Sequence, residues 1–247
     1  MSYKIAVLSD IHGNMRALDA VLVDIKHRCV DQVINLGDCA YGPFNPIPVL
    51  DRLIESTIPT VSGNEDQILV DPLLADGLSQ TARFTQSFLT QRHAEWLAAL
   101  PLRIEREDLI AFHAQPNDRA AYLLIRPTAD GGVRPATQDE FADLLSDVLQ
   151  PLILCGHDHL PRSLILADGR MIVNPGSVGC PAYDDDAPIP HRVANGTPHA
   201  RYTVVEIRDG VIRVEPIRVV YDWNAAADEV AANGFPNWAL WIATGRS

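Results

Sequence analysis

Short apolar runs alternate with stretches of helical period in the first part of the chain. Lys4 to Ser9 is an apolar run without strict alternation, which is typical of a strand covered on both faces. Asn14 to Arg28 then places apolar residues at three- and four-residue intervals with charged residues between them, which indicates an amphipathic helix. Val33 to Leu36 is the next predicted strand, so the chain opens as a β-α-β unit.

The same alternation continues to residue 155. Pro101 ends a long helical stretch, because its ring and its missing N–H oppose continuation of a helix. The pattern predicts helices over 47–56, within 79–100 and over 137–149, and strands over 58–61, 102–105, 109–113 and 152–155.

The pattern changes after residue 160, where short strands follow one another with little helix between them. Asp168-Gly169 and Asp209-Gly210 stand at tight hairpin positions, which require a residue that tolerates positive φ. A two-sheet core with helices outside therefore fits better than one doubly wound sheet. The predicted strands are 163–167, 171–173, 202–207 and 211–216; the stretches 115–135 and 181–200 read as irregular, either solvated loops or walls of a substrate pocket.

Length and composition favour one α/β domain over residues 1–247, because 47% of the 247 residues are hydrophobic and α/β folds of this size are common as single units. Residues 222–247 form a C-terminal helical appendage with three of the four tryptophans. This segment is interpreted as a helix packed on the domain, with a homo-dimer contact or a lid over the site as alternatives.

The net charge of −12 and the lack of a basic run argue against long nucleic acid and against an anionic membrane as partners. A small phosphate-ester substrate stays open, because divalent cations change the local sign of the charge. The four cysteines are scattered without a Cys-x-x-Cys pair, and no signal peptide or long apolar run is evident, so we expect reduced thiols without a catalytic role in a cytoplasmic protein.

Candidate chemistry lies in five polar islands, each at the end of an apolar stretch, where open α/β sheets place reacting groups. Their mixture of carboxylate, imidazole and amide donors suits hard divalent metals, whereas copper or iron-sulfur sites favour thiolates. Two metals need a bridging carboxylate, and together they favour in-line displacement at phosphorus. The islands are Asp10-Ile11-His12, Gly37-Asp38, Gly63-Asn64, His113 and Gly156-His157-Asp158-His159.

In their order and residue types, the islands resemble the motifs of the calcineurin-like metallophosphoesterase superfamily, which read Asp-x-His, Gly-Asp, Gly-Asn-His, a lone His and Gly-His-x-His. The segments 10–14, 41–43 and 174–179 further resemble its small prokaryotic branch, often labelled diadenosine tetraphosphatase-like. The resemblance extends to about residue 220. It implies a four-layer α-β-β-α sandwich of two mixed β-sheets flanked by helices.

The resemblance also implies roles for individual residues. One metal would be held by Asp10, His12, Asp38 and His159, and the other by Asp38, Asn64, His113 and His157, so that Asp38 is the bridge. A hydroxide shared by the metals would attack phosphorus, and Asn64 would orient a phosphoryl oxygen. The two divalent ions could be Mn, Fe, Zn, Ni or Mg.

Two departures from the family motifs bear on the substrate. Glu65 stands where many relatives have the imidazole that protonates the leaving oxygen, and it can act as that acid only if its pKa is raised well above its usual value of about 4.3. The segment after Asp38 reads Cys39-Ala40-Tyr41, without the arginine by which related protein phosphatases grip phosphate.

These departures favour a metal-dependent phosphodiesterase that acts on small phosphodiesters or nucleotides. A nucleotide phosphatase or dinucleoside polyphosphate hydrolase is the first alternative. A non-catalytic metal-bearing scaffold is the second, supported by the missing imidazole at Glu65 and opposed by the complete set of ligand types.

Overall fold

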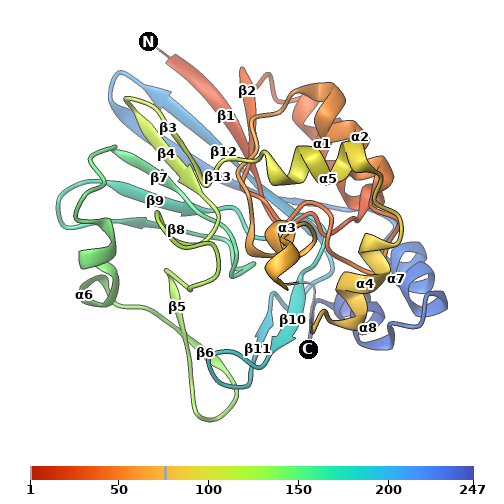
Figure 1. The fold of residues 1–247 in the computed structure, drawn as a ribbon. Helices are drawn as coiled ribbons and strands as arrows, with labels where there is room; N and C mark the ends of the chain where they lie inside the picture. The colour runs from red at the N-terminus through yellow and green to blue at the C-terminus, as the bar shows by residue number, and fades with distance from the viewer. Residues whose placement is uncertain (1, 75–76) are drawn as a thin grey trace.

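Two mixed β-sheets stacked face to face form the centre of the computed structural model, which describes residues 2–74 and 77–247 (Figure 1). The first sheet has the order β13-β12-β1-β2. Its strand β1 is parallel to β2 and antiparallel to β12, which in turn is antiparallel to β13. The strands are β1 (Ser2–Leu8), β2 (Gln32–Asn35), β12 (Ala200–Arg208) and β13 (Val211–Val219).

The second sheet has the order β3-β4-β7-β9-β8. Its three central strands β4, β7 and β9 are parallel, and both edge strands are antiparallel to their neighbours. The carboxyl ends of the central strands therefore meet at one edge. The strands are β3 (Arg103–Glu105), β4 (Leu109–Phe112), β7 (Leu152–Leu154), β8 (Arg162–Ile165) and β9 (Met171–Asn174).

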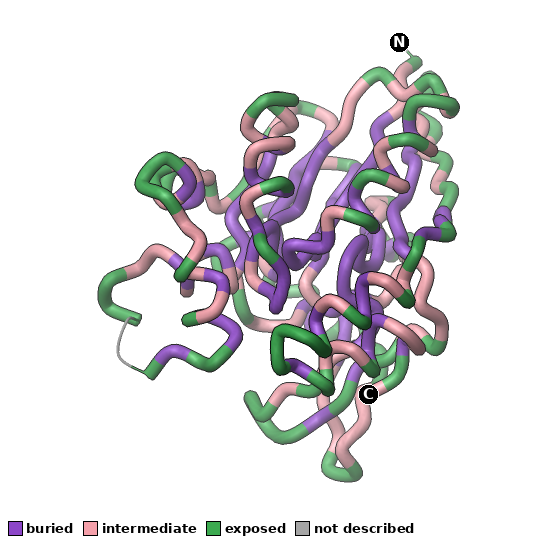
Figure 2. Tube along the Cα trace, turned by 90° about the vertical axis from the view of Figure 1, so that its right-hand side faces the viewer, coloured by how far each residue is buried: buried purple, intermediate pink, exposed green. Residues whose placement is uncertain are grey.

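Alternate residues of β1 face different layers, which explains its unbroken apolar sequence. Ala6 and Leu8 pack in the core beneath the helices, whereas Ile5 and Val7 pack between the two sheets. All four side chains are fully buried, as expected for a strand covered on both faces. Figure 2 shows buried residues along the central strands and exposed ones along the outer loops.

Helices cover the outer faces of both sheets, so the predicted four-layer α-β-β-α sandwich is confirmed (Figure 1). The layer on the second sheet is thin, with α6 and the adjoining 3₁₀ turn η2 packed on it through Phe141 and Leu145. The helices on the first sheet are α1 (Met15–Lys26), α2 (Ile47–Ser56), α5 (Gln91–Ala98), α7 (Trp223–Ala232) and α8 (Pro236–Thr244). The thin layer on the second sheet consists of α6 (Gln138–Phe141) and η2 (Asp143–Leu145). The connections contain α3 (Asn64–Ile68), η1 (Pro72–Leu74) and α4 (Gln80–Gln86).

Two predicted elements differ from the structure. The predicted strand 58–61 is wrong, because Thr60 makes only an isolated parallel bridge with Asn35, and Pro59 beside it lacks the N–H that a longer ladder would need. The predicted helix 137–149 is broken into α6 and η2.

The two stretches read as irregular each contain a short β-hairpin. Strands β5 (Ile125–Pro127) and β6 (Val133–Pro135) pair in the first, and β10 (Ala182–Asp185) and β11 (His191–Ala194) pair in the second. These strands are only three or four residues long, which is too short for a clear alternation of apolar and polar residues.

Candidate metal centre

The loops that follow β1, β2, β4 and β7 bring the predicted ligand side chains together. Hydrogen bonds join the first two loops, from the backbone N–H of Asp10 to the carbonyl of Gly37 and from that of His12 to the carbonyl of Asp38, both at 3.0 Å. The third and fourth loops are joined by the N–H of Gly156 and the carbonyl of His113, at 2.7 Å. Six of the seven predicted ligands lie in these loops, and the seventh, Asn64, is the first residue of α3.

Five of the predicted ligands have a left-handed backbone conformation, which is uncommon outside glycine and is enriched in Asp and His. Such a conformation turns the chain sharply as it leaves a strand, and its cost is typical of functional sites. The φ angles are 57° at Asp10, 51° at His12, 52° at Asp38, 69° at His157 and 58° at His159.

Asp10, His12 and His159 form the first group of donors. Oδ1 of Asp10 lies 3.3 Å from Nε2 of His159 and 3.9 Å from Nε2 of His12, and the two Nε2 atoms are 3.1 Å apart. The three side chains are buried and offer donor atoms within 4.8 Å of one another. This spacing suits a single cation.

Asp38, Asn64, His113 and His157 form the second group. Nε2 of His113 lies 3.2 Å from Oδ2 of Asp38, 3.1 Å from Oδ1 of Asn64 and 3.2 Å from Nδ1 of His157. The carboxylate of Asp38 also lies within 4.8 Å of a donor of His12, so it stands between the two groups. That position is the one expected of a bridging carboxylate.

The four imidazoles are oriented so that each keeps a nitrogen free toward the interior of the site. A neutral imidazole that donates from one ring nitrogen carries a lone pair on the other, and metal-binding histidines usually have this arrangement. The outer nitrogens bond to backbone carbonyls: Nδ1 of His12 to Tyr41 at 2.9 Å, Nδ1 of His113 to Leu36 at 2.7 Å, Nδ1 of His159 to Cys180 at 2.7 Å and Nε2 of His157 to Ala120 at 2.7 Å.

The residues fit a divalent metal pair for a second reason. Oδ1 of Asp10 is fully buried and accepts no hydrogen bond from any described residue. A buried carboxylate oxygen without a partner is costly, and a cation between Asp10 and the facing imidazole nitrogens would satisfy all of them.

The electrostatic field of the site favours positive charge. Burial alone would lower the pKa of His113, but the carboxylates of Asp38 and Asp10 outweigh it and raise that pKa to about 10. His157 differs, because burial and the charge of His113 lower its pKa to about 4. The excess of negative charge that raises the pKa of His113 would equally attract a divalent cation.

Glu65 lies beside the first group of donors. Oε2 of Glu65 is 3.2 Å from Nδ1 of His12, and its backbone N–H donates to Oδ1 of Asp38 at 3.0 Å. Burial, opposed by the hydrogen bond with His12, raises the pKa of Glu65 to about 7. A pKa shifted in this direction is what a general acid in this position needs.

Asp66 is a site residue that the sequence analysis missed. Its fully buried carboxylate accepts from the backbone N–H groups of Asp38 and Cys39, both at 2.8 Å, and from that of Gly63 at 3.1 Å. It thereby joins the loop after β2 to the start of α3. The sequence contained a signal, because a carboxylate three residues after Gly63 is at the position of a capping box.

A pocket of about 400 Å³ opens onto both groups of donors. Its aromatic wall comes from segments far apart in sequence, including the stretches read as irregular and the C-terminal helix α8. No Lys or Arg occurs among the described residues that line it, which are His12, Asp38, Tyr41, Asn64, Glu65, Ile68, Thr81, Tyr122, His157, His159, Cys180, Tyr183, Asp184, Asp185, Trp238 and Trp241.

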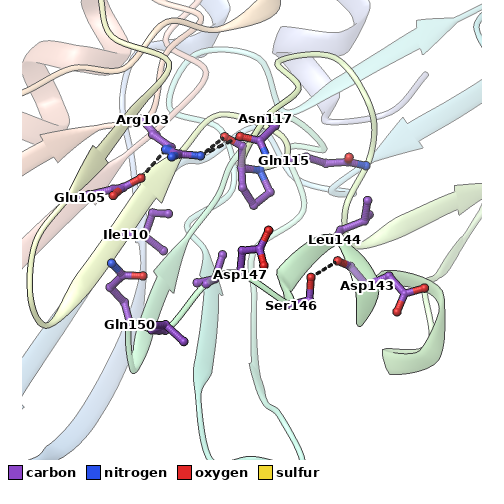
Figure 3. Close-up of a pocket in the computed structure, with 13 residues that line it drawn as sticks. Arg103, Glu105, Ile110, Gln115, Asn117, Asp143, Leu144, Ser146, Asp147 and Gln150 are labelled. Atoms are coloured by element: carbon purple, nitrogen blue, oxygen red, sulfur yellow. Dashed lines mark hydrogen bonds and ion pairs between the residues drawn. The ribbon is translucent and has the colours of Figure 1, made fainter.

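A second hollow, of about 540 Å³, lies beside β3 and η2 and contains none of the predicted ligands (Figure 3). The guanidinium of Arg103 in it donates to Oδ1 of Asn117 at 2.7 Å and pairs with Glu105. Its arginine is thus already engaged, and the donor groups needed for phosphoester chemistry lie in the first pocket.

Comparison with known proteins agrees with this site. Residues 3–192 match the family model described as the calcineurin-like phosphoesterase superfamily domain. The chain belongs to this superfamily. Membership implies a metal-dependent phosphoester hydrolase, and the match ends before α7 and α8.

Relatives of this calcineurin-like phosphoesterase are found in archaea and bacteria. The chain is 28% identical to uncharacterized protein MJ0912 of Methanocaldococcus jannaschii, over 95% of this chain and 94% of that protein. The crystal structure of a metallophosphoesterase from Sphaerobacter thermophilus is similar with a TM-score of 0.75 and 25% identity, and the match covers 99% of this chain and all of the other.

A more distant likeness concerns the fold alone. The crystal structure of a protein provisionally assigned as a diadenosine tetraphosphatase has a TM-score of 0.52 and 19% identity, over 87% of this chain and 93% of the other. Within the described part of the phosphoesterase, no helix is both long and apolar enough to cross a membrane.

Proposed function

We propose that the protein is a phosphodiesterase that uses two divalent metal ions to hydrolyse small phosphodiesters or nucleotides. The observation that carries the proposal is the charge of the pocket. Its described lining contains four acidic side chains, those of Asp38, Glu65, Asp184 and Asp185, and no Lys or Arg. A phosphodiester brings a single negative charge, whereas a monoester or a polyphosphate brings more, which this lining offers no side-chain cation to balance.

The loop after Asp38 supports the same choice. Cys39 and Ala40 are fully buried, and the backbone N–H of Cys39 is bonded to Asp66, so neither residue can grip a phosphate. Tyr41 reaches the pocket with a phenol, which is neutral. The bidentate guanidinium grip of related protein phosphatases has no counterpart in this loop.

The metal ions would be held by the two groups of donors. Asp10, His12 and His159 would bind one, and Asn64, His113 and His157 the other, with Asp38 shared between them. When bound, such a pair of ions polarises the phosphoryl group and makes water a strong nucleophile at neutral pH.

Protonation of the leaving group and orientation of the phosphoryl group are assigned to side chains that line the pocket beside these donors. Glu65, with its pKa raised to about 7, is proposed to give its proton to the leaving alcohol oxygen. Asn64 is proposed to orient a phosphoryl oxygen as well as to bind metal, since it begins α3 at the edge of the pocket.

The test is a panel of aryl phosphodiesters, aryl phosphomonoesters and dinucleoside polyphosphates, assayed on metal-stripped protein with single metals restored. We expect kcat/KM for the diester to exceed that for the monoester at least tenfold, and Asp38→Asn to abolish metal-dependent hydrolysis. A preference for monoesters or polyphosphates would establish the nucleotide phosphatase or dinucleoside polyphosphate hydrolase instead. Metal binding without hydrolysis of any ester would establish the scaffold.

A further inference from the structure

Helix α8 (Pro236–Thr244) brings Trp238 against a predicted metal ligand. The ring centroids of Trp238 and His12 are 5.8 Å apart at an interplanar angle of 66°, and the ring of Tyr41 lies 6.4 Å from that of Trp238. Trp238, only partly buried, lines the pocket. Because α8 follows the residues that match the family model, Trp238 lies outside the part of the chain that this family model describes, whereas Tyr41 lies within it.

We propose that Trp238 and Tyr41 bind a quaternary ammonium group carried by one alcohol of the phosphodiester. This inference rests on the proposed function and adds the chemical class of the substrate to it. It assigns Trp238 as a specificity-determining residue.

The aromatic rings supply the first argument. A cation over the face of Trp or Tyr is attracted by the ring quadrupole, most strongly in a site that excludes water. Tyr41 is fixed, because its hydroxyl shares a hydrogen bond of 2.8 Å with Oγ of Ser79. Trp238 is fixed by Trp241, whose ring centroid is 5.4 Å away. The positions of both rings are therefore fixed by the protein, with Trp238 against His12 and Tyr41 against Trp238.

A third ring extends the wall around the first group of donors. Tyr183, from β10, packs edge to face on His159 with centroids 4.6 Å apart, and it shares a small apolar cluster with Trp238 and Trp241. Rings from three separate parts of the chain thus line the pocket beside the first donor group.

The sign of the charge supplies the second argument. Asp184 and Asp185 line the same pocket and belong to neither donor group, and no described Lys or Arg lines it. Asp184 also pairs with Nε of Arg192 at 3.8 Å, so Asp185 is the carboxylate of the two without a cationic partner among the described residues. A nucleobase would stack on the rings and would meet the carboxylates only through neutral N–H donors, and an additional phosphate would be repelled. An ammonium group gains from the rings and from the carboxylates together.

The experiment compares two diesters of equal shape, methyl choline phosphate and methyl 3,3-dimethylbutyl phosphate, in which carbon replaces the charged nitrogen. Thymidin-5′-yl methyl phosphate is a third substrate. Hydrolysis by the metal-loaded protein is followed by ³¹P NMR. Trp238→Leu removes the ring, Trp238→Phe keeps an aromatic face, and Trp223→Leu is the matched control, because Trp223 contacts His199 and Tyr221 outside the pocket.

We expect kcat/KM for the choline ester to exceed that for its carbon isostere by about tenfold, the scale of a desolvated cation–π contact. Trp238→Leu should lower this ratio at least threefold, Trp238→Phe should retain most of it, and Trp223→Leu should retain all of it. Thermal unfolding shows whether each variant is folded. If Trp238→Leu is not, Tyr41→Leu, which removes the other ring, should lower the ratio at least threefold in its place.

Three results would overturn the inference while the proposed function stands. They are equal rates for the choline ester and its isostere, a ratio that Trp238→Leu leaves unchanged, and a Trp238-dependent preference for the thymidine ester. If no diester is hydrolysed, the proposed function fails. Calorimetry then measures Kd for phosphocholine and for 3,3-dimethylbutyl phosphate. The ratio of these two Kd values should change in the same variants as described for kcat/KM, and it decides the inference.

Discussion

The ring of Tyr122 stacks on the imidazole of His157, with centroids 4.8 Å apart and an interplanar angle of 28°. The hydroxyl of Tyr122 is held in turn by the hydroxyl of Tyr183 and by Nε2 of His191, both at 2.9 Å. Those two partners come from the hairpin of β10 and β11. The hairpin therefore fixes the orientation of a predicted metal ligand that it does not contact through its own backbone.

Tyr122→Phe keeps the stacked ring but removes the hydroxyl that anchors it. We expect the affinity of the metal site containing His157 to fall by up to about tenfold, less than on loss of a direct hydrogen-bond partner of a ligand, because the hydroxyl acts on His157 only through the stacked ring; the site containing His12 and His159 is retained. Calorimetric titration with metal analysis of the dialysed protein measures both sites. The control Tyr3→Phe, which removes a remote hydroxyl bonded to Asp108, should bind metal as the wild type does. If Tyr122→Phe binds two ions with wild-type affinity, the hydroxyl of Tyr122 has no role in orienting His157.

Gly63→Ala tests the packing around the predicted bridging carboxylate. A Cβ at Gly63 would lie 2.0 Å from Oδ1 of Asp38, so the carboxylate must move, although the φ of −81° at this residue is ordinary. We expect phosphodiester hydrolysis to fall at least about 100-fold, since small displacements of reacting groups have effects of this size.

Gly132→Ala is the matched control for this change, because its Cβ would meet no atom closer than 3.5 Å. Steady-state kinetics on an aryl phosphodiester compares the two variants with the wild type. Full activity in Gly63→Ala would show that the position of Asp38 does not limit the reaction.

Asp66→Ala should destabilise the fold as well as the site. The change leaves the buried N–H groups of Asp38, Cys39 and Gly63 without their acceptor, and each unsatisfied group costs about 1–3 kcal/mol. We expect the free energy of unfolding to fall by roughly 3 kcal/mol or more, measured by urea denaturation. Asp19→Ala, which removes an exposed partner of Arg52, should change it by less than about 1 kcal/mol; equal effects of the two changes would argue against the bracing role of Asp66.

Divalent metal should stabilise the folded protein. The unfolded chain lacks the assembled donor groups, so binding adds to the stability of the native state by about 2.7 kcal/mol at a free concentration one hundred times Kd. We expect Tm to rise with added Mn²⁺, Zn²⁺ or Ni²⁺ and to return on chelation, in scans of the metal-stripped protein. The double variant Asp10→Ala/Asp38→Ala should lose most of the rise; a Tm independent of metal in the wild type would show that the donors hold no ion.

The sequence by itself determined the layered core and the order of the donor loops. The strand at residues 4–9 could be predicted because its apolar residues are consecutive, which is a local consequence of burial on both faces. Asp10, Asp38, His113 and His157 could be selected because each follows such a run. These are short-range patterns, and the parallel order of β4 and β7 brings their ends together without further information.

Only the tertiary structure decided what surrounds the donors. Tyr122, Tyr183 and Trp238 lie in stretches without a readable period or in a helix beyond the family motifs, and their contacts with His157, His159 and His12 join residues that are distant in sequence. An aromatic side chain packs in a core and in a pocket wall for the same reason, the burial of its apolar surface. The sequence of amino acids therefore specified which groups are predicted to bind metal, and the packing of the hairpins and α8 specified which side chains line the pocket beside them.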